Sequence, residues 1–153
     1  MRLLIIALLL SLCFASTSNA QIEASRIKNY NVKKSLAIEG YDPVSYFSNN
    51  PQKGKHEFSY VYKRITYWFS SQANLNKFKA SPDKYEPTYG GWCAYAMGET
   101  GEKVKIDPKT YKILNGQLYL FYNFGGNNTL TDWNKNEKDL KSKADQNWKK
   151  IVQ

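Results

Sequence analysis

The sequence predicts a small α+β domain with two β-hairpins, short helices and a C-terminal amphipathic helix. Three observations predict it: period-two alternation over 56–69, an Asn-Gly pair between two apolar runs at 111–122, and apolar residues at helical spacing from 129 to 151. The aromatic content of 15% rests largely on Tyr and Trp, which supply core area. The chain is long enough to form one hydrophobic core and too short to form two.

The first twenty residues have the pattern of a secretory signal peptide. Arg2 gives a basic start, the apolar run 3–14 is too short to span a bilayer, and Ser18-Asn19-Ala20 is a small-x-small cleavage site. Leu12 precedes Cys13 where a lipoprotein signal needs a small residue, so we expect no lipid anchor. We therefore expect an exported protein, periplasmic or extracellular, whose mature chain begins at Gln21 without a transmembrane segment.

The charge pattern bears on the partners. The formal net charge is +9, and loss of Arg2 with the signal leaves 9 − 1 = +8. The lysines are spread along the chain, which is more typical of solubility, or of loose attraction to anionic lipid or polysaccharide, than of nucleic-acid recognition. Export also argues against nucleic acid. We expect a metal ion or an unknown envelope protein as the partner.

The N-terminal half of the mature chain predicts an arm, a helical turn and a hairpin. Residues 21–39 form the expected arm or short helix, and Asp42-Pro43 predicts a turn of helix that places Val44 and Phe47 inward. Strands on either side of Lys63-Arg64 form the first hairpin.

A helix follows this hairpin. Ser70 or Ser71 is its expected cap, Leu75 and Phe78 form its apolar face, and Ser81-Pro82 ends it.

The C-terminal half predicts a second hairpin and a long amphipathic helix. Asn115-Gly116 favours a type I′ turn between the strands 111–114 and 118–122. Thr129 with Asp132 resembles a capping box. The helical stripe that follows comprises Leu130, Trp133, Leu140, Ala144, Trp148 and Ile151.

The stretch 89–98 holds the residue with the most chemical potential, Cys93. Gly90 and Gly91 make a helix entrance, and a helical turn from Trp92 places Cys93 and Met97 on one face. With Cys13 removed, Cys93 is alone in an oxidising compartment, so no intramolecular disulfide is expected. Cys93 is then either a buried small hydrophobe, a metal ligand or a redox thiol.

Copper is the first metal to consider. Thiolate and thioether donors select Cu(I), and His can complete such a site. Cys93, Met97 and His56 are the residues of these types in the mature chain, so they form the candidate ligand set, with His56 the weakest member. A Cys/His hydrolase, a carboxylate pair and a phosphate-binding loop are all poorly supported by the sequence, and we expect a binding protein rather than an enzyme.

Several motifs together resemble the YHS domain, a small α+β module associated with metals. They are Asp42-Pro43-Val44, Tyr67-Trp68-Phe69-Ser70-Ser71 through Asn74 to Phe78, and Ser81-Pro82-Asp83-Lys84-Tyr85. The resemblance implies a YHS-like domain over 40–153, with a core motif at 40–85 and an extension at 86–153. The extension, with Tyr89 to Ala96 and Trp148, is similar to a secreted stand-alone subgroup.

The chain departs from the metal-binding form of that family. The positions where the family has cysteines are Ser45, Ser70 and Asn74 here, and these cannot supply thiolates. The resemblance also implies that some relatives have selenocysteine at the position of Cys93, which would make it a reactive site.

Three functions follow as hypotheses: an exported module that binds or handles copper, a thiol-based redox protein in which Cys93 is catalytic, and a non-catalytic interaction domain with Cys93 in its core.

Overall fold

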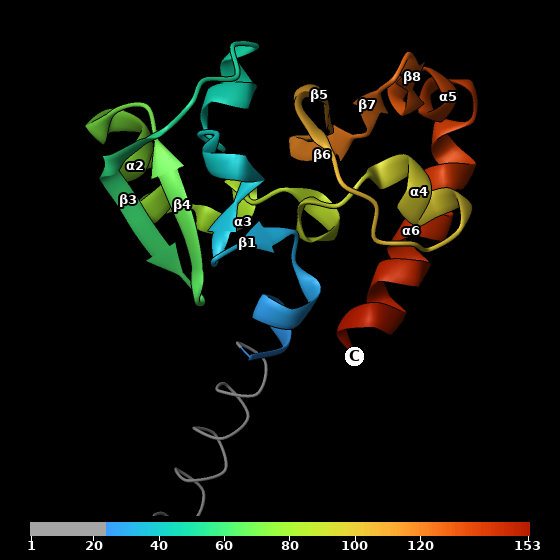
Figure 1. The fold of residues 1–153 in the computed structure, drawn as a ribbon, viewed down its shortest axis with the longest axis horizontal. Coiled ribbons are helices and arrows are strands. Elements are labelled where there is room, and N and C mark those ends of the chain that lie inside the picture. The colour runs from blue at the N-terminus through green and yellow to red at the C-terminus, as the bar shows by residue number, and fades with distance from the viewer. Residues whose placement is uncertain (1–23) are drawn as a thin grey trace, which may run out of the picture.

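The computed structural model describes residues 24–153 (Figure 1). It confirms an α+β fold, with a four-stranded sheet in the order β1-β2-β4-β3, two two-stranded sheets, and helices around them. In Figure 1 the four-stranded sheet and the helices α4 and α6 lie on opposite sides of the molecule. The expected signal peptide, including Cys13, lies outside the described residues.

The segment expected as an arm contributes to the main sheet. A helix over 24–29 leads into β1 (Val32–Lys33) and β2 (Leu36–Ala37), which pair antiparallel. Lys34 and Ser35 between them have φ of 51° and 67°, the left-handed geometry of a two-residue hairpin turn. Leu36 then pairs parallel with Thr66. β1 is therefore an edge strand of the sheet, and β2 joins it to β4.

The first predicted hairpin is confirmed. β3 (Lys55–Tyr62) pairs antiparallel with β4 (Ile65–Phe69), and Lys63 and Arg64 take the positive φ of the turn. Every second residue of β4 is buried, as the alternation predicts.

Helix α2 (Gln72–Ala80) follows β4. Ser71 is its cap, because its side chain accepts a hydrogen bond from Asn74 N, and Leu75 and Phe78 are buried. The short helix α3 (Pro82–Tyr85) then leads out of this half of the molecule.

Two single-turn 3₁₀ helices join the sheet to its surroundings. Residues Ile38–Gly40 form η1 after β2, and Ser45–Ser48 form η2, which begins two residues later than the sequence predicts. Asp42 is not its cap, because the N-cap is Val44; Asp42 Oδ1 instead accepts a hydrogen bond from Val44 N at 2.8 Å and forms the turn that precedes the helix. Tyr46, rather than Phe47, is the fully buried aromatic residue of this turn.

The second predicted hairpin is also confirmed. β5 (Asp107–Leu114) pairs antiparallel with β6 (Gln117–Phe121), and Asn115 and Gly116 have φ of 51° and 75°. A small third hairpin follows, formed by β7 (Asn123–Phe124) and β8 (Asn127–Asn128).

The glycine-rich stretch forms η3 (Thr88–Gly91), and α4 (Ala94–Glu99) follows it. Pro87 and Cys93 make isolated parallel bridges to Leu118 and Leu120, so this segment runs beside β6.

The C-terminal helix is two helices, α5 (Thr129–Lys135) and α6 (Glu137–Val152), separated at Asn136. The expected cap is displaced by one residue: the Asn128 side chain accepts from Leu130 N, while Thr129 is the first helical residue. Within the described part of the chain, no helix has the length and apolar character needed to cross a membrane.

Two groups of buried residues form the core. The first lies between the main sheet, α2 and β6, and includes Phe69, Phe78 and Cys93. The second surrounds Trp133 and includes Met97 and Leu140. The Tyr46 hydroxyl donates to the carbonyl of Pro108 at 2.8 Å, which ties η2 to β5.

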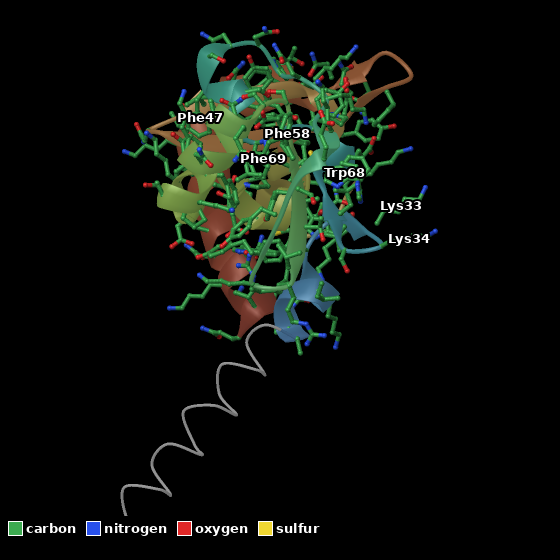
Figure 2. All side chains as sticks on the ribbon, turned by 90° about the vertical axis from the view of Figure 1, so that its left-hand side faces the viewer. Lys33, Lys34, Phe47, Phe58, Trp68 and Phe69 are labelled. Atoms are coloured by element: carbon green, nitrogen blue, oxygen red, sulfur yellow. The ribbon has the colours of Figure 1, made fainter. Side chains whose placement is uncertain are left out.

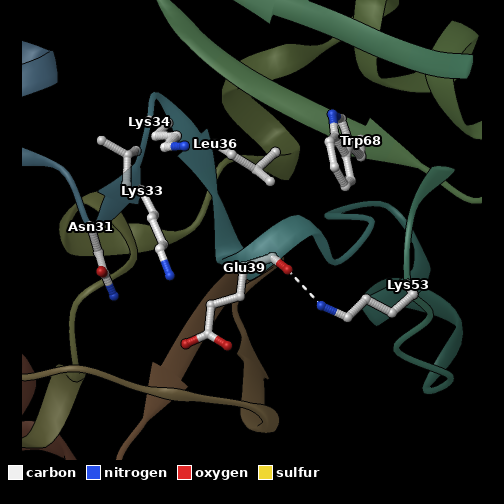
Figure 3. Close-up of a pocket in the computed structure, with 8 residues that line it drawn as sticks. Asn31, Lys33, Lys34, Leu36, Glu39, Lys53 and Trp68 are labelled. Atoms are coloured by element: carbon white, nitrogen blue, oxygen red, sulfur yellow. Dashed lines mark hydrogen bonds between the residues drawn. The ribbon is translucent and has the colours of Figure 1, made fainter. Parts of the chain in front are cut away.

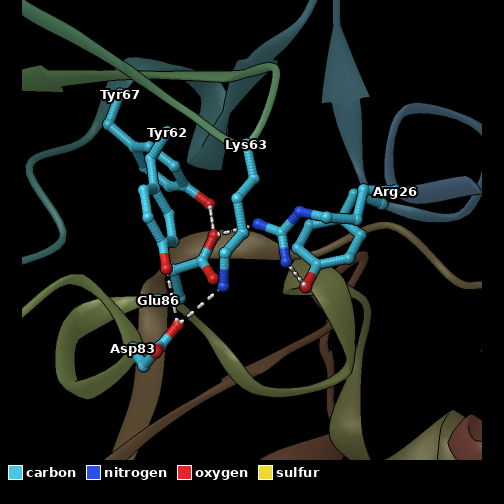
Figure 4. Close-up of polar contacts among 7 residues, drawn as sticks. Arg26, Tyr62, Lys63, Tyr67, Asp83 and Glu86 are labelled. Carbon is cyan, nitrogen blue, oxygen red and sulfur yellow. Dashed lines mark hydrogen bonds and ion pairs between the residues drawn. The ribbon is translucent and has the colours of Figure 1, made fainter. Parts of the chain in front are cut away.

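A polar network fastens the helix over 24–29 to the sheet (Figure 4). Arg26 donates to Glu86 Oε1 at 2.5 Å and to the Tyr30 hydroxyl at 2.7 Å, while the Tyr67 hydroxyl donates to the same Glu86 oxygen at 2.5 Å. The side chains of Arg26 and Glu86 are only 13% and 10% exposed, so the pair is poorly screened by solvent. The network holds the chain that enters β1 in place.

Candidate functional site

Cys93 lies at the N-terminus of α4 and is fully buried, at 0% exposed. Its backbone is fixed on both sides: Cys93 N donates to Val104 O at 3.0 Å, and Cys93 O accepts from Met97 N at 3.0 Å. The side chain packs into the first core group. It is the one cysteine among residues 24–153, and it is free, in agreement with the expected absence of an intramolecular disulfide in this part of the chain.

The Cys93 sulfur has a partner on each side. Tyr122 N donates to Cys93 Sγ at 3.3 Å, and Thr129 Oγ1 lies 3.4 Å from the sulfur. Thr129 has one hydroxyl proton and donates it to Tyr122 O at 2.9 Å, so the thiol proton of Cys93 is the one directed at Thr129 Oγ1. The three residues form a closed ring of hydrogen bonds that satisfies a neutral thiol.

A pocket of about 270 Å³ lies against this ring. Its lining includes Cys93, Tyr95, Thr129 and the acidic residues Glu99 and Glu102. The lining formed by the described residues therefore places two acidic side chains, and no basic one, in the pocket next to Cys93.

The three candidate copper ligands lie in different surroundings. Met97 is fully buried in the second core group, around Trp133, whereas Cys93 belongs to the first. His56 lies on β3, exposed, and its ring meets the ring of Trp68 edge to face with centroids 5.7 Å apart. Within residues 24–153, no three His, Cys, Asp or Glu side chains are grouped closely enough to hold a metal ion.

The positions at which the resemblance implied cysteines do come together, around Asp42. Asp42 is fully buried, and its Oδ2 accepts from Ser70 N, from Ser70 Oγ at 2.7 Å and from Asn74 Nδ2 at 2.7 Å. Ser45 Oγ donates to Asp42 O at 2.6 Å. The cluster is a satisfied carboxylate that joins η2 to the start of α2, and its donors leave no soft ligand for a metal.

A groove of about 720 Å³ lies at the edge of the main sheet (Figure 3). It is larger than the pocket at Cys93 and falls within the range of roughly 300 to 1,000 Å³ that is typical of ligand sites. Apolar, basic and polar side chains line it together: Asn31, Val32, Lys33, Lys34, Leu36, Glu39, Lys53 and Trp68.

Two glycines position Trp68 above the groove. A Cβ on Gly40 would lie 3.0 Å from Trp68 Cε3, and one on Gly54 would lie 2.4 Å from the Trp68 carbonyl carbon. Gly54 N also donates to Gly40 O at 2.8 Å, which fixes the two glycine segments together. Only residues without a side chain let these segments approach Trp68 so closely. Because His56 packs on the same ring, its structural role is to support Trp68.

The lysines of the groove differ in what they contact. Lys53 Nζ donates to Glu39 O at 2.6 Å and lies 4.7 Å from the centre of the Tyr41 ring. Lys33 and Lys34 are exposed at the rim of the groove, on the β1–β2 hairpin that projects from the body of the molecule (Figure 2). Neither forms an ion pair with a carboxylate of the described chain. With Glu39 as its one acidic residue, the groove has a net charge of 3 − 1 = +2.

Sequence reasoning did not find this groove. Most of its lining belongs to the continuous segment 31–39, while Lys53 and Trp68 come from the loop before β3 and from β4. The parallel contact of Leu36 with Thr66 and the hydrogen bond from Gly54 N to Gly40 O bring these segments together. The available signal was the basic pair Lys33-Lys34 between the apolar residues Val32 and Leu36. These residues lie in the segment that was expected to be an arm.

Comparison with known proteins gives no match: no family model, no curated protein and no solved structure matches this chain. The resemblance to the YHS domain therefore stays a prediction from the motifs.

Proposed function

We propose that the chain is an exported, non-catalytic binding module that holds an anionic ligand in the groove beneath Trp68. One observation carries the proposal: the Trp68 ring and two lysines without ion pairs, Lys33 and Lys34, line the same groove of about 720 Å³. Ligand sites combine apolar surface with polar groups that fix orientation, and this groove combines three apolar side chains with five polar or charged ones. Export is expected from residues 1–20.

The state of Cys93 supports a non-catalytic role. A reactive thiol is normally accessible and lies in an electropositive environment. Cys93 is instead fully buried, has hydrogen-bond partners on both sides, and faces a pocket with two glutamates. Among the three hypotheses from the sequence, the interaction domain agrees best with this geometry.

The proposal is tested by calorimetric titration of the mature chain with three anions: trigalacturonate, ATP and tripolyphosphate. At least one is expected to bind. Replacing Lys33 and Lys34 by Gln removes two cations from the groove, and we expect about tenfold weaker binding, because each solvent-exposed ion pair contributes roughly 0.2 to 1 kcal/mol. Binding should also weaken as salt screens the charges.

Lys149→Gln with Lys150→Gln is the matched control. These adjacent, exposed lysines at the end of α6 carry the same charge but do not line the groove. Their replacement should leave the affinity unchanged. Equal losses in the two double variants would indicate general charge attraction rather than a site, and absence of binding by all three anions would contradict the proposal.

A second candidate, thiol chemistry at Cys93, is favoured by one observation: the 270 Å³ pocket reaches this residue. Opening of the ring with Thr129 would expose the sulfur there. The test is the alkylation rate of the folded protein by iodoacetamide as a function of pH. A rate close to that of a free thiol, with a depressed apparent pKa, would support this candidate over the binding module.

A further inference from the structure

We infer that the ligand of the groove is an acidic sugar chain, one that carries a carboxylate on its rings. This inference rests on the proposed function and names the class of anion. The observations behind it are the kinds of side chain that meet in the groove and their arrangement around Trp68 (Figure 3).

The apolar wall fits a flat ring with a C–H face. Trp68 is half-buried and held by Gly40 and Gly54, so its indole is a rigid platform. Leu36 extends from β2 toward the same space (Figure 3). Val32 also lines the groove and adds to its apolar wall. Aromatic side chains combine a large apolar area with little conformational freedom, which suits stacking against a sugar ring.

The polar groups fit both parts of such a ligand. Lys33 and Lys34 supply ammonium groups for carboxylates. Glu39 supplies a carboxylate that is exposed and without an ion pair in the described chain, so it can accept hydrogen bonds from hydroxyl groups. Asn31 donates its amide N–H to Gly91 O at 3.0 Å, which fixes the side chain and leaves its carbonyl oxygen as a second acceptor.

Other anions match this set of groups less well. A polyphosphate concentrates negative charge and has few donors, so the Glu39 carboxylate would repel it without a compensating hydrogen bond. A lipid chain needs an extended apolar cavity, whereas only three of the eight lining residues, Val32, Leu36 and Trp68, are apolar. A uronic acid chain has separated charges, many hydroxyl donors and apolar ring faces.

The experiment compares trigalacturonate with its fully methyl-esterified form, which keeps the rings and loses the charges. We expect the ester to bind at least tenfold more weakly, equivalent to about 1.4 kcal/mol. Trp68→Phe, which keeps an aromatic ring of smaller area, should weaken trigalacturonate binding about threefold to tenfold. Two-dimensional NMR spectra of each variant establish that the fold is retained.

Glu39→Gln separates sugar recognition from simple charge attraction. This variant removes repulsion of every anion but also removes the strongest hydroxyl acceptor, so the ratio of trigalacturonate affinity to tripolyphosphate affinity should fall about fivefold. An unchanged ratio would overturn the assignment of Glu39 and of a sugar.

The outcomes distinguish the inference from the proposed function. One outcome is that ATP or tripolyphosphate binds in a way that depends on Lys33 and Lys34 while trigalacturonate does not bind. In that case the inference of an acidic sugar is wrong, and the proposal of an anion site in the groove is retained. If none of the anions binds in a way that depends on these lysines, both fail.

Discussion

The backbone of Gly54 lies directly against the backbone of Trp68: a Cβ on Gly54 would stand 2.4 Å from the Trp68 carbonyl carbon and 2.6 Å from its oxygen. The conflict is with main-chain atoms, which cannot move aside as a flexible side chain can. This contact sets the height of Trp68 above the groove, so the loop before β3 and the strand β4 act as one unit in forming the candidate site.

Gly54→Ala should therefore destabilise the fold by about 2 to 3 kcal/mol, the upper part of the range of roughly 1 to 3 kcal/mol that is typical of overpacking. Gly116→Ala is the control, since no atom lies within 4 Å of a Cβ there and only its φ of 75° opposes the substitution. It should cost about 1 to 2 kcal/mol. Urea unfolding of both variants measures the difference, and a smaller loss for Gly54→Ala would contradict the packing described here.

Cys93→Ser should lower the free energy of unfolding by about 1 to 3 kcal/mol, because a smaller, more polar atom replaces a buried sulfur with two partners. Calorimetric binding at the groove should be unchanged, since Cys93 does not line it. Loss of ligand binding in a folded Cys93→Ser protein would show that Cys93 serves the site.

The copper prediction is tested by titrating Cu(I) against a competing chelator. The Cys93 sulfur already contacts Tyr122 and Thr129, and Met97 packs in the other core group. We therefore expect equal Cu(I) binding by the mature protein and by Cys93→Ser. Binding that disappears in Cys93→Ser would restore the copper site of the sequence analysis.

Stability should decrease in alkali. Burial, reinforced by the negative charge of Glu86, raises the pKa of Tyr30 from 10.0 to about 12. The unfolded chain loses this proton at lower pH than the folded chain, so the stabilising contribution is complete below pH 10 and is lost as the pH rises toward about 12.

Urea midpoints measured across that pH range should fall, and the fall should be shallower in Tyr30→Phe. Burial also raises the pKa of Tyr67, so part of the pH dependence remains in this variant. If the urea midpoints of the two proteins fall equally steeply with pH, the raised pKa of Tyr30 in the folded protein is contradicted.

Much of the fold could be predicted because its signals are local. The turns at Lys63-Arg64 and Asn115-Gly116, the cap of α2 and the burial of Phe78 all depend on neighbours in the sequence. The cap of α5 was misplaced by one residue because Asn128 and Thr129 are both good caps, and only the conformation of β8 selects Asn128.

The candidate site was not predictable in the same way. Periodicity could not show that Leu36 pairs with Thr66, a parallel contact across 30 residues that builds the groove. The spacing of Cys93 and Met97 predicts a helical turn, and Met97 N does donate to Cys93 O. Spacing could not show that the two residues belong to different core groups, which depends on how α4 packs against its neighbours.

The central claim is that ligand binding occurs at the groove and not at Cys93, and a chemical-shift map with trigalacturonate tests it most directly. The account predicts changes in the Trp68 indole N–H and in the backbone amides of Lys33 and Glu39, with the amides of Cys93 and Tyr122 unaffected. Changes concentrated at Cys93 and Tyr122, with the Trp68 signal unmoved, would contradict it.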